Sequence, residues 1–338
     1  MTEEMREPDS VRPLLTLAIP TFNRARYLNE LLSTLFDQLR NEPRVELIVS
    51  DNASPDETPS VIEEYRQRGL GVRYMRNETN IGADANFLQC FEQASAKYVW
   101  IFGDDDVLAA GAIRKILAYL EVEEYDLVYV NSYLFKGSYM PKAARESLKP
   151  TRYVDSYAFA RRINVFFTFI GGNIINRERV LASNQTDLSA LVGTSLVQLG
   201  WTYAALNGFA LGLYFKEKLV GMRTENTGGY KLLEVFGTTF RRVTDQWLHP
   251  EALSRAVVNG AIQRFWPGIL LAYRKSSERF TDQASARVVL TPVFGDNVRY
   301  WVFLYPAIVL PLTLAKCWLL AVRAVNRIDR AFGYFLLK

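Results

Sequence analysis

Short runs of β-branched and aromatic residues alternate with amphipathic stretches over the first 135 residues of the chain. Each apolar run predicts a buried strand, and each amphipathic stretch predicts a helix that packs on it. Repeated strand–helix units form a mostly parallel sheet with helices on both faces, so the pattern predicts an α/β fold. The predicted strands are Leu14–Phe22, Val45–Asp51, Val72–Arg76, Tyr98–Phe102 and Asp126–Phe135, and the predicted helices are Tyr27–Leu39, Thr58–Arg68, Ala83–Ala94 and Ala112–Leu120.

The predicted strands end in polar segments that are rich in Asp, Asn, Ser and Thr. The carboxyl ends of parallel strands share one edge of a sheet, and ligands bind there in folds of this class. We therefore expect the segments to lie together and to bind a small molecule. They are PTFNR (20–24), SDNASPDE (50–57), RNETNIGADAN (76–86) and FGDDD (102–106).

Three adjacent aspartates, Asp104, Asp105 and Asp106, follow the apolar strand YVWIF. Carboxylates crowded at the end of a buried strand repel one another, and a divalent cation relieves that repulsion best. Oxygen ligands suit Mg²⁺ or Mn²⁺, whereas a lone His249 and two cysteines outside any CxxC pattern exclude a Cys/His zinc site. An equally good alternative is a helix N-terminus that Asp106 caps.

Two further strand ends carry candidate ligand-binding residues. Backbone N–H groups and the side chains of Thr21 and Asn23 would face a molecule at the end of the first strand, although ordinary helix capping also explains them. Asp51 could accept a hydrogen bond from a base N–H or a ribose hydroxyl, and the alternative for it is an Asx turn.

The charge of the chain is unevenly distributed. The total of 40 Lys/Arg and 36 Asp/Glu leaves only +4, so we expect no nucleic-acid partner. From Ala252 onward there are twelve Lys/Arg and four Asp/Glu, a net charge of +8, against −4 for the preceding residues. The polar, acidic N-terminus is unlike a signal peptide, which favours a cytoplasmic location.

A helical pattern begins at Pro250, which predicts a domain over residues 1–250, with halves 14–135 and 136–250, and a helical region over 251–338. The uncharged run Trp301–Ala315 has fifteen residues and two prolines, and is shorter than the roughly 18–20 residues that span a bilayer. We therefore expect peripheral attachment to an anionic membrane surface, the cytoplasmic face of a bacterial inner membrane.

The expected attachment element is an interfacial helix near the C-terminus, with Arg323, Arg327 and Arg330 on one face and Phe332, Phe335 and Leu336 available to another. One alternative is a single spanning helix in which Lys316 snorkels. Another is a helix packed on the protein's own core.

The ordered set PTFNR, VSDNAS, RNETNIGADAN and FGDDDVL resembles the N-terminal half of family 2 glycosyltransferases, which have the Rossmann-like GT-A fold. The resemblance implies that Asp51 binds the base of a nucleotide and that the aspartates hold Mn²⁺ or Mg²⁺ with the sugar diphosphate. Asp105 matches the family's aspartate motif in either of two alignments, so it is the expected principal metal ligand. The nucleotide-binding residues expected from these motifs are Pro20, Thr21, Asn23, Arg24, Asp51, Asn80, Gly82, Asn86 and Asp104, and the expected metal ligands are Asp104, Asp105 and Asp106.

Arg223 lies in the Gly-rich segment MRTENTGGYK, 222–231, ahead of its two glycines. Basic residues on family lids close over the diphosphate, so the resemblance makes Arg223 a further nucleotide-binding candidate. The alternative is an ordinary surface arginine.

The second half of the chain departs from the family. Many inverting members carry a Glu-Asp pair whose Asp deprotonates the acceptor, but Thr194 and Ser195 stand in its place here, and neither is a plausible base. Either Asp187 or another carboxylate takes that role, or the enzyme retains the anomeric configuration. The segment GTSLVQLGW, with GDDD and the basic tail, resembles the branch that contains bacterial abequosyltransferases, which use a CDP-linked 3,6-dideoxyhexose and form an α-linked product. This branch favours retention.

The sequence therefore predicts a metal-dependent hexosyltransferase that moves a sugar from a nucleoside diphosphate to a lipid-linked glycan in O-antigen synthesis. We expect a CDP-sugar such as CDP-abequose, with UDP- or dTDP-sugars and an inverting mechanism as the alternative. A sugar nucleotidyltransferase agrees less well with the sequence, because the Gly-rich, Lys-bearing phosphate loop of that enzyme class is absent. An inactive membrane scaffold is the rival outside enzymology.

Overall fold

The computed structural model describes residues 12–137, 139, 144, 148–183, 187–224, 231–275, 282 and 284–331. The chain forms two compact units. The first contains the residues up to Arg152 together with Ile170–Thr186 and Leu213–Thr224. The second contains Tyr153–Phe169, Asp187–Gly212 and Glu225–Lys338.

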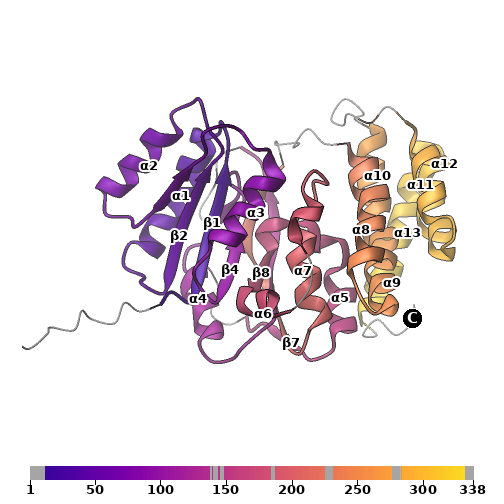
Figure 1. Cartoon of the computed structure of the whole chain (residues 1–338). Coiled ribbons are helices and arrows are strands. Elements are labelled where there is room, and N and C mark those ends of the chain that lie inside the picture. The colour runs from indigo at the N-terminus through magenta and orange to yellow at the C-terminus, as the bar shows by residue number, and fades with distance from the viewer. Residues whose placement is uncertain are drawn as a thin grey trace, which may run out of the picture. The chain divides into compact units, whose positions relative to one another are not determined.

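The first unit is an α/β domain, and the alternation predicted over the first 135 residues is confirmed (Figure 1). Every predicted strand and helix forms, with ends within two residues of those expected. The strands are β1 (Leu15–Thr21), β2 (Val45–Asp51), β3 (Arg73–Arg76), β4 (Tyr98–Ile101), β5 (Val107–Leu108) and β6 (Leu127–Phe135), and the helices are α1 (Ala25–Leu39), α2 (Thr58–Gln67), α3 (Ala83–Gln93) and α4 (Ala112–Leu120).

The sheet has nine strands in the order β3-β2-β1-β4-β8-β6-β9-β5, with β7 (Thr151–Tyr153) beside β9. The pairs β3–β2, β2–β1 and β1–β4 are parallel, as expected. The sequence pattern did not predict β5, β7, β8 (Asn173–Asn176) or β9 (Gly212–Arg223), and antiparallel pairs that involve them make the other half mixed. β8 is antiparallel to both β4 and β6, and β9 is antiparallel to β5. The sheet is therefore mixed, with its parallel half at the N-terminal strands.

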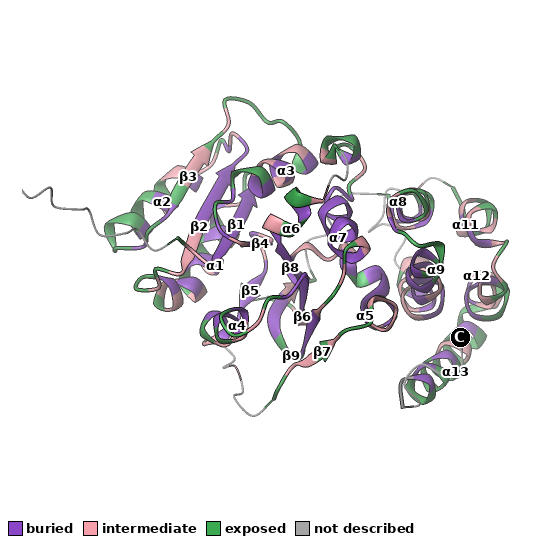
Figure 2. Cartoon of the chain, turned by 60° about the horizontal axis from the view of Figure 1, so that its bottom comes forward, coloured by how far each residue is buried: buried purple, intermediate pink, exposed green. Residues whose placement is uncertain are grey.

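Helix α1 and strand β1 fix the position of the polar strand ends. All seven residues of β1 are buried (Figure 2). Leu28, Leu31, Leu32 and Leu35 of α1 are also buried, at the spacing of one helical face. Burial of each leucine stabilises the fold by about 2 kcal/mol, so the short connection from Thr21 to Ala25 is held at both ends.

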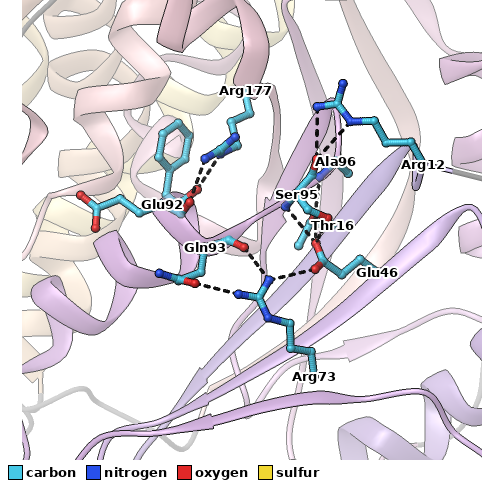
Figure 3. A network of polar contacts seen from close by, with 10 residues as sticks. Arg12, Thr16, Glu46, Arg73, Glu92, Gln93, Ser95, Ala96 and Arg177 are labelled. Atoms are coloured by element: carbon cyan, nitrogen blue, oxygen red, sulfur yellow. Dashed lines mark hydrogen bonds and ion pairs between the residues drawn. The ribbon is translucent and has the colours of Figure 1, made fainter. Parts of the chain in front are cut away.

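A polar network holds the opposite end of the sheet (Figure 3). The Glu46 carboxylate accepts hydrogen bonds from Thr16 Oγ1 at 2.6 Å and from Ser95 N at 3.0 Å. Arg73 donates to Glu46 and to the carbonyl oxygen of Gln93, the last residue of α3. Arg177 donates to the carbonyl of Glu92. Because these cations satisfy the terminal carbonyls of α3, the helix is anchored at its C-terminus.

The second unit is helical. It includes segments that precede residue 250, where the sequence pattern placed the start of the helical region. Helix α5 packs on α9, and α7 packs on α8, so residues before 250 join the C-terminal helices. The helices are α5 (Ser156–Ile163), α7 (Gln198–Asn207), α8 (Phe240–Trp247), α9 (Glu251–Gly260), α10 (Trp266–Lys275), α11 (Ala286–Phe294), α12 (Tyr305–Val309) and α13 (Leu312–Ala331), with short 3₁₀ turns at Asn164–Thr168 and Leu188–Leu191 and π-helical turns at Glu234–Thr239, Ala261–Phe265 and Tyr300–Leu304. The first unit also contains α6 (Arg177–Ala182) and a 3₁₀ turn at Ile170–Gly172.

The uncharged run near the C-terminus is not one helix. The π-helical turn Tyr300–Leu304 leads into α12, the backbone becomes extended at Leu310, and α13 begins at Leu312. Across the described residues, none of the helices has both the length and the apolarity that a bilayer span requires. Arg323 and Arg327 are exposed on α13, whereas the side chain of Arg330 and residues 332–338 lie outside the described part of the chain.

Candidate active site

The three aspartates form a tight loop between β4 and β5. The backbone N–H of Asp106 donates to the carbonyl of Gly103 at 3.2 Å, which closes the turn. The chain then enters β5, and helix α4 begins only at Ala112 with Gly111 as its N-cap. The alternative that Asp106 caps a helix is therefore wrong, because strand residues follow it.

Asp104 is tied to the end of β1. Thr21 Oγ1 donates to its Oδ2 at 2.7 Å, and an Arg24 guanidinium nitrogen donates to its Oδ1 at 3.0 Å. Burial raises the pKa of Asp104 to about 6, even though Arg24 and Thr21 act in the opposite direction. The expected partners Thr21, Arg24 and Asp104 thus lie together, as the motif spacing indicates.

Asp105 and Asp106 differ in exposure. The Asp105 side chain is 19% exposed and lies 3.8 Å from Arg24, whereas Asp106 is buried and accepts a hydrogen bond from the Arg223 backbone N–H. Burial, with the charges of Asp105 and Asp104, raises the pKa of Asp106 well above its ordinary value. Asp105 is therefore the carboxylate of this loop that is most accessible to a ligand.

The loop does not form a complete metal cage. In the part of the chain that the structure describes, no three Asp, Glu, His or Cys side chains are arranged to hold a cation. The pKa values of Asp104 and Asp106 are raised, so the negatively charged forms of these side chains are disfavoured. A bound dication would favour the charged forms instead. Mg²⁺ binds by one or two carboxylates together with substrate phosphates, so the loop fits a metal that arrives with a phosphate ligand.

Arg223 lies beneath the aspartate loop and is not a surface residue. It is 8% exposed, and its guanidinium stands 4.9 Å from the ring centre of Tyr27 and 4.6 Å from that of Phe135. Its Nε donates to the carbonyl of Asp105 at 3.2 Å, and it pairs with Glu30 of α1. These contacts direct Arg223 to the loop backbone, and its contact with a diphosphate stays a prediction. The following Gly-rich residues 225–230 lie outside the described residues.

Asp51 occupies the end of β2, directly beside Thr21 in the parallel register. It is fully buried, and it accepts hydrogen bonds from Ser54 N at 2.8 Å and from the Tyr74 hydroxyl at 2.6 Å. Arg76 lies 3.5 Å from the same carboxylate. The Asp51 carboxylate shapes the turn and positions Tyr74 and Arg76 at the strand edge, and its contact with a base stays a prediction.

Asparagine side chains organise the segment before α3. Asn52, which the sequence motifs did not single out, donates to Asn80 Oδ1 at 2.8 Å and to the Gly82 carbonyl at 3.3 Å. Gly82 has φ +89°, a conformation that side-chain-bearing residues rarely adopt. Asn86 is buried and exchanges hydrogen bonds with Ser50. Asn80, Gly82 and Asn86 are thus joined to the ends of β2 by one network.

The connection between β1 and α1 is held by two side chains from the next loop. The Asn23 backbone N–H donates to Ser54 Oγ at 2.9 Å, and Asn23 has φ +54°. Asp56 accepts from the Ala25 N–H at 2.8 Å, so this N–H is already satisfied within the protein. Pro20 is the buried penultimate residue of β1 and places Thr21 at the edge. Asp56 lies in the polar segment 50–57, but the motifs did not single it out.

The candidate base and its neighbours belong to the second unit. Asp187 is exposed and caps the turn Leu188–Leu191 by accepting from Ser189 N at 3.0 Å. Thr194 Oγ1 donates to the carbonyl of Leu191 at 2.6 Å, and Ser195 has φ +61°. The role of Asp187 as a base stays a prediction.

Comparisons with known proteins agree with these motifs. Residues 16–182 match the sequence model of glycosyl transferase family 2. The abequosyltransferase RfbV of Salmonella typhimurium is 39% identical over 109 residues, which make up 32% of this chain and 33% of RfbV. A GalNAc(5)-diNAcBac-PP-undecaprenol beta-1,3-glucosyltransferase of Campylobacter jejuni is 30% identical over 131 residues, 38% of this chain and 41% of that enzyme. The chain thus aligns with less than half of the length of either relative.

Solved structures share the fold at low sequence identity. S. aureus TarS 1–349 in complex with UDP-GlcNAc matches with a TM-score of 0.59 and 16% identity, covering 95% of this chain and 92% of TarS. The mannosyltransferase PcManGT from Pyrobaculum calidifontis, in complex with GDP-Man and Mn²⁺, matches with a TM-score of 0.52 and 15% identity over 96% of this chain and 90% of its own. Residues 16–182 therefore form a family 2 glycosyltransferase domain on the GT-A fold.

Proposed function

We propose that the protein is a metal-dependent hexosyltransferase that moves a sugar from a nucleoside diphosphate to a hydroxyl of a lipid-linked glycan in bacterial surface polysaccharide synthesis. The observation that carries the proposal is the junction of the aspartate loop with the end of β1. Thr21 and Arg24 hold Asp104 there, and Asp51 stands beside Thr21 in the sheet.

The residues at this junction have different roles in the proposed reaction. Asp105, the most accessible carboxylate, is the principal metal ligand, with Asp104 and Asp106 adjoining it. Mn²⁺ or Mg²⁺ would neutralise charge on the departing diphosphate. Arg24 bonds Asp104 and is one-third exposed, so its guanidinium also presents positive charge toward that diphosphate. Asp51 positions Tyr74 and Arg76 for the base.

The donor we propose is a CDP-linked 3,6-dideoxyhexose such as abequose, and the transfer retains the anomeric configuration. Support comes from the likeness to RfbV, whose name specifies abequosyl transfer, and from Thr194 and Ser195 at the place of the family's acid pair. A retaining reaction needs no carboxylate base there, because the leaving phosphate accepts the acceptor's proton on the same face.

The location we propose is peripheral, at the cytoplasmic face of the bacterial inner membrane, where lipid-linked glycans are extended. Support comes from the net charge of +8 after Ala252 and from the likeness to a glucosyltransferase whose name specifies an undecaprenol-linked substrate.

Nucleotide binding and donor hydrolysis test the proposal. Thermal shift with CDP, UDP, GDP and dTDP, each with Mn²⁺, should give the largest stabilisation with CDP. Hydrolysis of the matching sugar nucleotide should require Mn²⁺ or Mg²⁺ and should stop in EDTA. Hydrolysis at full rate in EDTA would contradict the metal, and stabilisation by none of the four nucleotides would favour an inactive scaffold.

A further inference from the structure

Helix α13 packs on the protein through a face that is apolar in its first half and polar toward its C-terminal end. Its buried positions include Val322, Asn326 and Asp329, which share one helical face. Asn326 Oδ1 accepts from Gln263 at 2.6 Å, and Asp329 pairs with Arg264 at 3.3 Å. Hydrogen bonds and an ion pair therefore hold the inner face of α13 against the neighbouring helical segments.

The outer face of α13 is apolar. Leu314, Leu320 and Ile328 are 54%, 64% and 51% exposed, and Figure 2 shows exposed positions along the helix. At about 100° per residue they cover the side opposite the buried positions, with Ala321 and Ala324 between them. An amphipathic helix in water buries its apolar side, whereas these three apolar side chains of α13 are more than half exposed.

A cationic stripe adjoins the apolar outer face. Lys316, Arg323 and Arg327 are all exposed and fall within about 40° of one another around the helix axis. The exposed surface of α13 therefore has two sectors, one apolar and one basic. This combination is typical of helices that lie in the plane of an anionic membrane interface.

We propose that the outer face of α13 inserts into the headgroup region of an anionic lipid bilayer. The apolar sector would enter the acyl boundary while Lys316, Arg323 and Arg327 contact lipid phosphates. A second copy of the chain is a poorer occupant, because an isologous contact across this face would bring the two cationic stripes together. This membrane contact rests on the peripheral location proposed above. It adds that the outer face of α13 is the contact surface and that the lipid is anionic.

The chain carries a natural reporter for this surface. Cys317 is exposed and lies on the outer face, whereas Cys90, the other cysteine, is fully buried. An environment-sensitive fluorophore on Cys317 of the full-length protein should shift to the blue and brighten with phosphatidylglycerol-containing vesicles. Pure phosphatidylcholine vesicles should produce a much weaker response. An unchanged spectrum with both vesicle types would overturn the proposal.

Paired variants separate the two sectors. Arg323→Gln/Arg327→Gln should weaken binding to anionic vesicles by about 25-fold, since each basic residue near such a surface is worth about fivefold. Leu320→Gln/Ile328→Gln should also weaken binding. Matched substitutions on exposed residues of the first unit, Lys216→Gln/Lys218→Gln and Val122→Gln, should leave it unchanged. Equal effects of the α13 and control variants would contradict a specific face.

Two further readouts keep this inference distinct from the proposed reaction. Circular dichroism checks that each variant is folded, and donor hydrolysis in vesicle-free solution should be unaltered by the α13 variants. Vesicle binding without any donor hydrolysis would contradict the proposed transferase activity and leave the membrane contact of α13 supported. A blue shift that needs no lipid and grows with protein concentration, together with a dimer in solution, would overturn the membrane assignment in favour of self-association.

Discussion

The guanidinium of Arg223, at the end of β9, forms an ion pair with the carboxylate of Glu30, one full helix turn into α1. The same guanidinium donates to the backbone of the aspartate loop and lies between two aromatic rings. Residues from distant parts of the sequence thus support the loop that carries the candidate chemistry.

Arg223→Ala should destabilise the protein by about 3 kcal/mol or more, because it leaves Glu30 without its cation and opens the space between the rings. Arg223→Lys should restore part of the stability but lower donor hydrolysis, since an ammonium lacks the fork that reaches both Glu30 and the Asp105 carbonyl. Urea unfolding and steady-state kinetics measure the two effects. Arg26→Ala, on an exposed position of α1, is the control. Equal kinetics for Arg223→Lys and wild type would remove the supporting role.

Asp105→Asn should lower donor hydrolysis on the order of 100-fold, because the side chain is the accessible metal ligand of the loop. The melting temperature should change little, because asparagine has nearly the same shape as aspartate. The Mn²⁺ concentration for half-maximal rate should rise together with the nucleotide KM. Near-normal turnover in Asp105→Ala would exclude this carboxylate as the principal ligand.

Glu46→Gln should lower stability by about 1–3 kcal/mol near neutral pH, where the carboxylate accepts several hydrogen bonds. Burial would raise the pKa of Glu46, but hydrogen bonds from Thr16, Ser95 and Arg73 outweigh it and hold the pKa below its ordinary value of 4.5. A lowered carboxyl pKa stabilises the fold above the unfolded pKa and loses that contribution as pH falls. The difference between wild type and Glu46→Gln in urea unfolding should therefore be full above about pH 5.5 and shrink as the pH falls below 4.5. A difference that is constant from neutral to acid pH would contradict the assignment.

Asp187→Asn should leave sugar transfer within about threefold of wild type, because a retaining enzyme needs no base at that position and the side chain is an exposed turn cap. NMR of the product should show the same anomeric configuration as the donor. A β-linked product from an α-linked donor, together with an inactive Asp187→Asn, would establish inversion with Asp187 as base.

The first unit shows where sequence reasoning succeeds. Its early strands and helices follow from apolar periodicity alone, because each buries one face on its neighbours in sequence. β8 and β9 escaped prediction because they pair with strands far away along the chain: Ile174 lies opposite Trp100, and Gly221 lies opposite Val107. No local pattern marks such pairing.

The candidate site shows the same difference between local patterns and contacts that only the folded chain makes. Thr21, Asp51 and Asp104 could be identified because they lie at or just after the ends of β1, β2 and β4. These strands are parallel neighbours in the sheet, which brings the three residues together. The support of the loop by Arg223 could not be identified, because Tyr27, Glu30 and Phe135 meet it only in the folded chain. The inner side of α13 could likewise not be identified, because only the folded chain places Asn326 and Asp329 there.

Gly103 restricts how the aspartate motif can change. A Cβ atom built there would stand 3.2 Å from Asp106 Oδ2 and 3.3 Å from Asp105 Oδ1, so any side chain would begin by displacing the carboxylates it joins. An aspartate at this position would also add a negative charge beside Asp104 and Asp106, whose pKa values burial already raises. A Gly103→Asp substitution would therefore need a compensating change elsewhere in the loop.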